Sequence, residues 1–149
     1  MQTILCATRG GVESQVSQKA AHALARAEGL RLIYLYVVDT DFMRSTTELS
    51  YVHDAAREIK KLGEFILAVA VERAKAEGVE ADGIVRQGKW QDEIAAVAAE
   101  LRPRYVMLGS SGLTTPYEWE MARQRAARIR QSSGAELIIV LPTGELRHF

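Results

Sequence analysis

Five short apolar segments alternate with four helical patterns along this chain, and this alternation restricts the fold more than any other feature. The apolar segments are residues 2–8, 32–38, 79–85, 105–108 and 137–141. Strands that alternate with helices are joined by right-handed crossovers, which place the strands parallel in one sheet. The sequence therefore predicts an α/β fold: a single doubly wound domain, residues 1–149, with a five-stranded parallel sheet in the order 3-2-1-4-5 and helices on both faces.

The composition of three segments predicts their places in the sheet. Residues 32–38 are nearly all apolar without alternation, which is typical of a strand that helices cover on both faces. Residues 79–85 contain Glu80, Asp82 and Gly83, and such residues favour an edge strand. Residues 137–141 are followed by Pro142 and are predicted to form an apolar strand at the opposite edge.

Each helical pattern has recognisable ends and an apolar face. Ser14 is the predicted cap of the first helix, Gly29 ends it, and His22 beside its apolar face is interpreted as structural. Arg102 and Pro103 end the third helix, and Pro116 begins the fourth. The predicted apolar faces are Val16, Ala20 and Leu24; Val52, Ile59, Leu62, Ile66 and Val69; Ile94, Val97 and Leu101; and Trp119, Ala122, Ala126 and Ile129.

Charge and cysteine content exclude several classes of function. The chain has 19 basic and 19 acidic residues, so it lacks the positive surplus typical of proteins that bind nucleic acid or anionic membranes. The apolar run 32–38 is far too short to span a bilayer, and residues 1–6 do not resemble a signal peptide. We therefore predict a cytoplasmic protein with no nucleic-acid and no membrane partner. The single cysteine, Cys6, excludes an internal disulfide and is predicted to lie in the core.

Two glycine-rich turns are the candidates for a ligand site. Gly10 and Gly11 follow the first strand, and residues 109–112 (Gly-Ser-Ser-Gly) follow the fourth. In the order 3-2-1-4-5 the winding reverses between strands one and four, so both turns flank the crevice where open α/β sheets bind ligands. Glycines let backbone N–H groups surround an anion, but glycine and serine are also common in turns without a ligand. Spacing alone leaves both interpretations open.

Four segments resemble the universal stress protein family, and the resemblance covers essentially the whole chain. Residues 4–10 are similar to the first strand and turn of that family, 36–39 to the end of its second strand, 106–113 to its fourth strand and loop, and 137–140 to its last strand. Nucleotide-binding members carry G-x2-G-x9-G-(S/T), and Gly109 and Gly112 match the first half. Ala122 and Arg123 replace the second half, and Arg9 replaces an Asp that contacts the nucleotide.

These departures, together with the helix 117–129, make the chain resemble the subclass that lacks the complete ATP-binding motif. The resemblance implies a nucleotide or anion crevice formed by Thr8, Arg9, Gly10, Val37, Gly109, Ser110, Gly112 and Arg123. Arg9, Arg123 and Arg125 can replace the lost backbone contacts by holding an anion with guanidinium groups, or they can be ordinary surface charges. The resemblance also implies a homodimer through the C-terminal strand from Leu137 to Leu141.

Two functions remain open at this point. The first is a stress-response or regulatory protein, a non-catalytic homodimer with a degenerate nucleotide site. The alternative is a sensor that binds ATP or AMP with the loop from Gly109 to Gly112. No catalytic and no metal-binding residues are predicted, because His22, His53 and His148 are not spaced as metal ligands and neither loop serine has a histidine partner.

Overall fold

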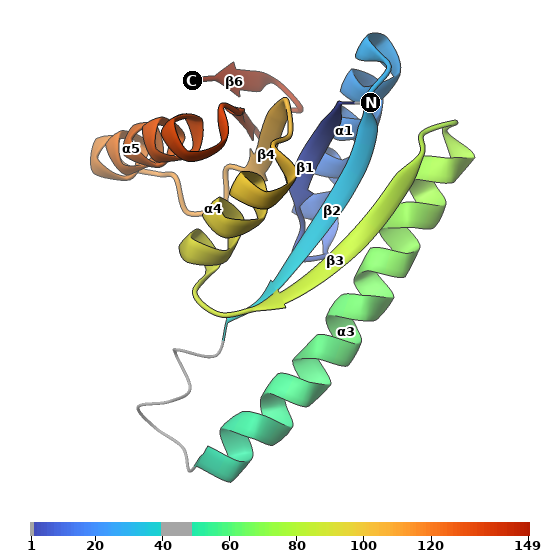
Figure 1. Ribbon diagram of the computed structural model, residues 1–149, viewed down its shortest axis with the longest axis vertical. Helices are drawn as coiled ribbons and strands as arrows, with labels where there is room; N and C mark the ends of the chain where they lie inside the picture. The colour runs from blue at the N-terminus through green and yellow to red at the C-terminus, as the bar shows by residue number, and fades with distance from the viewer. Residues whose placement is uncertain (1, 40–48) are drawn as a thin grey trace.

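The computed structural model describes residues 2–39 and 49–149, and within residues 49–53 it describes the backbone only. The predictions for the side chains of Val52 and His53 therefore lie outside the described residues. The strands form one six-stranded sheet (Figure 1). The elements in chain order are β1 (Thr3–Ala7), α1 (Val12–Glu28), β2 (Arg31–Val38), α3 (Leu49–Ala76), β3 (Ala81–Gln87), α4 (Trp90–Leu101), β4 (Tyr105–Gly109), α5 (Pro116–Ser133), β5 (Glu136–Val140) and β6 (Leu146–His148).

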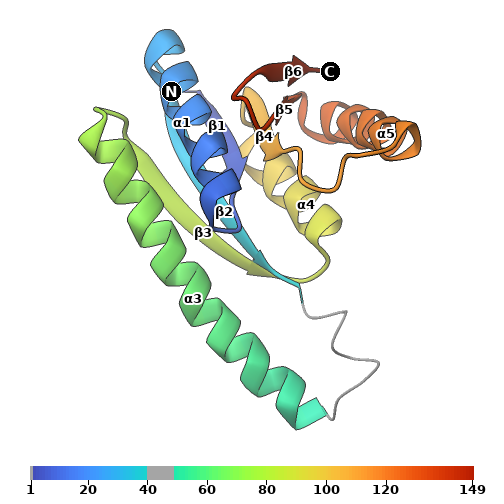
Figure 2. The same ribbon diagram turned by 180° about the vertical axis from the view of Figure 1, so that it is seen from behind.

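Helices cover both faces of the sheet, with α1 and α3 on one face and α4 and α5 on the other (Figure 2). Side chains of a strand alternate between the two faces: Ile4 and Cys6 pack against α1 and α3, whereas Leu5 packs against α4 and α5. All three residues are fully buried. Because each central strand is buried on both sides, its sequence is apolar throughout, which is the pattern that predicted a parallel sheet.

The predicted α/β fold is confirmed. Strands β1 to β5 are parallel and follow the order 3-2-1-4-5, and β3 is an edge strand as its polar residues indicated. Helix α4 begins at Trp90, and α5 begins at Pro116, one residue after its cap Thr115. The buried face of α5 includes the predicted Ala122, Ala126 and Ile129. The strand order that was predicted from the sequence therefore places the carboxyl ends of the five parallel strands at one end of the sheet.

A sixth strand, which was not predicted from the sequence, pairs with β5 and covers the side edge of the parallel sheet. Strand β6 runs antiparallel to β5, with Ile138 opposite His148 and Val140 opposite Leu146. The prediction that residues 137–141 form an edge strand is therefore wrong, and Leu141 belongs to the turn that follows β5. Strand β6 has only three residues and two of them are polar, so no apolar alternation marks it in the sequence.

Helix α1 begins earlier than its sequence indicates. Gly11 is the residue before the first turn, and no side chain caps the helix, so the predicted cap at Ser14 is wrong. The hydroxyl of Ser14 instead accepts a hydrogen bond from the N–H of Arg9, at 3.2 Å. Gly29 ends the helix in the left-handed conformation, as predicted. The glycines at the start of α1 thus leave the N–H groups of its first turn without a side-chain cap.

Helix α3 packs on the sheet through a narrower face than the predicted one. Leu62 was expected to be buried but is 54% exposed, while Gly63, Leu67 and Ala70 face the sheet. A Cβ at position 63 would lie 2.7 Å from Cε1 of Tyr36, so glycine permits the close approach of α3 to β2. In the described ranges 2–39 and 49–149, no helix is long and apolar enough to cross a bilayer.

Candidate functional site

A cavity of about 610 Å³ opens at the carboxyl ends of β1, β4 and β5. Its other walls come from the first turns of α1, from the start of α4, and from the segment that leads from β4 into the first turn of α5. Strand order reverses between β1 and β4, so the cavity occupies the position where ligands bind in open α/β sheets. We refer to this cavity as the crevice. A volume of this size is within the range of small-molecule binding sites.

The turn between β1 and α1 forms one side of the crevice. Thr8 is buried, and its hydroxyl accepts hydrogen bonds from Nε2 of Gln18 at 3.2 Å and from the N–H of Gly10 at 3.5 Å. The N–H of Arg9 donates to the hydroxyl of Ser14. Gly10 has a φ of +79°, a conformation that glycine adopts without strain. The backbone of the turn is therefore fixed, while the Arg9 side chain is exposed at the rim of the crevice.

The glycine loop after β4 forms the opposite side. The N–H of Leu113 donates to the carbonyl oxygen of Ser110 at 3.0 Å, which closes a tight turn. Within this turn Gly112 has a φ of +83°. A Cβ at Gly109 would lie 3.4 Å from the hydroxyl of Ser17, because the loop passes close to α1. Two glycine turns thus face one another across the crevice, as the sequence predicted.

Two guanidinium groups lie against a single indole ring beside the glycine loop. Cζ of Arg9 is 5.0 Å from the centroid of Trp90, and Cζ of Arg125 is 5.3 Å from it. Trp90 is the first residue of α4, and its backbone N–H donates a hydrogen bond to a carboxylate oxygen of Asp39 at 3.2 Å. The two arginines and Trp90 line a second cavity of about 270 Å³, which shares Gly109 and Gly112 with the crevice.

The charges of Arg9 and Arg125 are not balanced by an ion pair within the described residues. Other arginines of the chain do form ion pairs with carboxylates. On β3, Arg86 pairs with Glu93 and Glu100; on α5, Arg123 pairs with Glu120 and Arg128 with Asp92. Partial burial lowers the pKa of Arg125, because the charged guanidinium loses hydration. An anion bound beside Trp90 would replace that hydration with charge-assisted hydrogen bonds.

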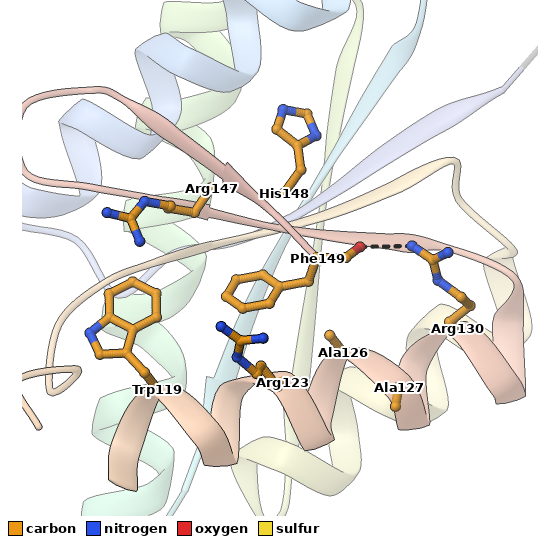
Figure 3. Close-up of a pocket in the computed structure, with 8 residues that line it drawn as sticks. All are labelled: Trp119, Arg123, Ala126, Ala127, Arg130, Arg147, His148 and Phe149. Carbon is orange, nitrogen blue, oxygen red and sulfur yellow. Dashed lines mark hydrogen bonds between the residues drawn. The ribbon is translucent and has the colours of Figure 1, made fainter. Parts of the chain in front are cut away.

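Helix α5 begins directly after the glycine loop, and side chains occupy its N-terminus. The hydroxyl of Thr115 accepts from the N–H of Glu118 at 3.2 Å, and the Glu118 carboxylate accepts from the N–H of Thr114 at 2.6 Å. The backbone hydrogen bond from Thr114 lowers the pKa of Glu118. Ala122 consequently lies in the second turn of α5, fully buried, and Arg123 borders a different pocket beside β6 (Figure 3).

The structure brings together most of the predicted site residues. Thr8 lies buried directly before the turn that borders the crevice. Val37 is half-buried in β2 and packs against the core formed with α4 and α5, so Val37 and Arg123 do not line the crevice. Five of the eight predicted residues do line it: Arg9, Gly10, Gly109, Ser110 and Gly112.

Two aromatic residues that line the crevice were not predicted as site residues from the sequence. Trp90 begins the helix that follows the third strand, so it lies at the same edge of the sheet as the glycine turns, and this position was the available signal. Trp119 was predicted only as part of an apolar helix face, yet it lines both the crevice and the pocket beside β6. Arg125, considered at first only as a third basic residue, shares the Trp90 ring with Arg9.

The other titratable groups predicted to be structural lie in the core. His22 is buried, and its ring nitrogens contact the Glu77 carboxylate and the Tyr34 hydroxyl. Burial raises the pKa of the Cys6 thiol to about 12. Within residues 2–39 and 49–149, no three histidine, cysteine, aspartate or glutamate side chains converge as a metal site.

A model of the Universal stress protein family matches residues 1–119, from before β1 to the first turn of α5. Among curated proteins no match was found. Three similar solved structures have a TM-score of 0.57 or more and cover 93% of this chain. At identities of 13–22% the similarity shows a shared fold.

The match to this chain covers nearly the full length of each of the three solved structures. A universal stress protein in complex with cAMP is 22% identical, with a TM-score of 0.67 and 96% of that chain covered. UspA from Lactobacillus plantarum is 13% identical, with a TM-score of 0.70 and 97% covered. A universal stress protein from Archaeoglobus fulgidus in complex with dAMP is 15% identical, with a TM-score of 0.57 and 97% covered.

Proposed function

This chain belongs to the universal stress protein family, and on that premise we propose that it is a non-catalytic stress-response regulator that binds an adenosine monophosphate in the crevice. The phosphate binds to Arg9 and Arg125, and the glycine loop after β4 contributes backbone N–H groups. The crevice lining contains no histidine within the described residues, so neither Ser110 nor Ser111 has the histidine partner of a serine nucleophile there. Binding without chemical turnover is the function that this lining supports best.

The observation that carries the proposal is the pair of guanidinium groups on Trp90. Two cations on one indole repel each other, and neither has an ion-pair partner within the described residues. A phosphate dianion placed between them and the glycine loop would neutralise both charges and accept bidentate hydrogen bonds from each. The adjoining crevice, about 610 Å³ in volume, leaves room for the nucleoside.

A monophosphate suits this site better than a triphosphate. The second half of the triphosphate-binding motif would need a glycine and a hydroxyl, but Ala122 is buried in α5 and Arg123 borders another pocket. The carboxylate of Glu118 at the N-terminus of α5 lines the cavity beside Trp90, so it would repel any phosphate beyond the one whose charge Arg9 and Arg125 balance. We therefore propose that the site is degenerate for ATP but retained for AMP-like ligands. The complexes of two related structures with cAMP and dAMP support a single phosphate group.

The proposal includes a cytoplasmic homodimer that uses the C-terminal edge of the sheet. Strand β6 now forms this edge, so the contact surface is the β5–β6 hairpin rather than a bare strand from Leu137 to Leu141. An unpaired outer strand offers backbone groups to the same strand of a second copy. Sedimentation velocity should give a dimer mass that becomes monomeric when His148→Pro removes an outward-facing backbone donor from β6, whereas a monomeric wild-type protein would contradict this part of the proposal.

Calorimetric titration with AMP tests the binding site. Wild-type protein should show saturable heat, and Arg9→Ala should weaken binding about 10- to 100-fold, because a hydrogen bond to a charged group contributes about 1.5–3 kcal/mol. Arg123→Ala is the matched control and should bind AMP like the wild type. Equal loss in both variants, or no heat with wild-type protein, would overturn the assignment of the phosphate to Arg9.

A further inference from the structure

A separate pocket, of about 620 Å³, lies between α5 and β6, on residues that the crevice does not use apart from Trp119 (Figure 3). We refer to it as the C-terminal pocket. All of its lining residues except Trp119 lie beyond residue 119, where the match to the family ends. Its volume is within the range of sites that hold small organic molecules.

The return of β6 over β5 builds this pocket. After β5 the chain turns through Gly144, whose N–H donates to the carbonyl oxygen of Leu141 at 2.8 Å, and β6 brings Arg147 and Phe149 beside α5. A guanidinium nitrogen of Arg130 on α5 donates to the main-chain oxygen of Phe149 at 2.7 Å, which fixes the end of the strand (Figure 3). The pocket is therefore a defined feature of the folded chain.

Aromatic rings form one wall of the C-terminal pocket. Trp119 and Phe149 are stacked, with ring centroids 6.2 Å apart and an angle of 21° between their planes. Cζ of Arg147 is 5.5 Å from the centroid of Trp119. The pocket stays open because Ala126 and Ala127 of α5 extend no further than a methyl group. A planar apolar ring can therefore pack against the two aromatic side chains in the space beside Ala126 and Ala127.

The remaining lining of the pocket is basic. It contains Arg123, Arg130, Arg147 and His148 and no acidic side chain. Arg147 has no carboxylate partner within the described residues, and the pair between Arg123 and Glu120 spans 3.8 Å between two exposed side chains, where such pairs contribute little. His148 contacts Glu136 at 2.7 Å. Arg123 and Arg147 therefore offer guanidinium donors to an anion beside the aromatic wall.

We propose that the C-terminal pocket is a binding site for a small aromatic anion, an aromatic ring that carries a carboxylate or sulfonate group. The ring lies against Trp119 and Phe149, and the acidic group accepts hydrogen bonds from Arg123 and Arg147. This site is separate from the phosphate site at Arg9, and Trp119 is the one lining residue that it shares with the crevice.

Fluorescence of anilinonaphthalene sulfonate, an aromatic anion, tests the proposal. The chain has two tryptophans, so Trp90→Phe leaves Trp119 as the only energy donor and restricts energy transfer to probes bound near it. Saturable transfer is expected, with affinity reduced at least about tenfold by Arg147→Ala. The control is Arg128→Ala, which removes an exposed arginine of α5 outside this pocket and should leave the affinity unchanged.

Two further measurements distinguish the effect of charge on binding from the effect of pocket shape and from loss of folding. Ala127→Leu fills the pocket from an exposed helix position where leucine is well tolerated, so it should abolish energy transfer without unfolding the protein. Uncharged phenylnaphthylamine should bind at least about tenfold more weakly than the sulfonate, and benzoate should displace the sulfonate better than inorganic phosphate does. Unchanged affinity in both Ala127→Leu and Arg147→Ala, or equal binding of the uncharged probe, would overturn the proposal.

Discussion

Gly63 in α3 offers a stability test in which two effects of opposite sign compete. Replacing glycine by alanine inside a helix normally stabilises it by about 0.8–1 kcal/mol. Here the added Cβ would lie 2.7 Å from Cε1 and 2.9 Å from Cγ of Tyr36, so the ring or the helix must shift. Overpacking of this kind costs about 1–3 kcal/mol. Gly63→Ala should therefore lower the free energy of unfolding by about 1 kcal/mol, against the helix propensity.

A double-mutant cycle with Tyr36→Ala isolates the contact. Without the Tyr36 ring, Gly63→Ala should raise the free energy of unfolding by about 1 kcal/mol, because only the helix propensity remains. The coupling between the two positions is then about 2 kcal/mol, and urea unfolding followed by circular dichroism resolves a difference of that size. Stabilisation by Gly63→Ala in both backgrounds would refute the close packing of α3 on β2.

Three further predictions concern single residues. Burial lowers the pKa of His22 and outweighs the opposite effect of Glu77. The unfolded chain, in which the pKa of His22 is 6.5, therefore binds more protons than the folded chain as the pH drops below that value. The free energy of unfolding should accordingly fall as the pH drops below 6.5, and His22→Gln should make this fall less steep. Cys6 is buried with a raised pKa, so a thiol reagent at pH 8 should modify it only in denaturant, and rapid labelling of native protein would contradict its burial. Arg102 ends α4 with a φ of +47°, and Arg102→Gly should raise thermal stability by about 1 kcal/mol, whereas a loss would mean that the arginine side chain contributes more than the strain.

Much of the fold could be predicted because the patterns that mark its strands and helix ends are local in the sequence. Both faces of β2 are buried, which the unbroken run 32–38 indicates directly, and the glycine or proline at most helix ends is equally local. Strand β6 could not be predicted, because its pairing depends on contact with β5 rather than on its own composition. The buried face of α3 was wrong at Leu62 for a related reason: the helix packs through Gly63, and a pattern of apolar residues does not count glycine as a contact.

The candidate site was predicted in position more than in composition. Topology places both glycine turns at one edge of the sheet, so Gly10, Gly109 and Gly112 could be brought together from sequence. Arg123 could not be placed, because a motif with fixed spacing assumes a loop where this chain starts α5 at Pro116. The partnership of Arg9 with Arg125 depends on Trp90 as a third residue from another element, and no spacing in the sequence reports it.

The phosphate site at Arg9 and Arg125 is tested most directly by comparing AMP with adenosine in the same calorimeter. The two ligands differ only in the phosphate, so their difference in affinity measures what all contacts to the phosphate contribute, and the double variant isolates the share of the two guanidinium groups. We predict that wild-type protein binds AMP at least about tenfold more tightly than adenosine, and that Arg9→Ala combined with Arg125→Ala removes this preference. Equal affinity for AMP and adenosine in the wild-type protein, or an unchanged preference in the double variant, would contradict the proposed function.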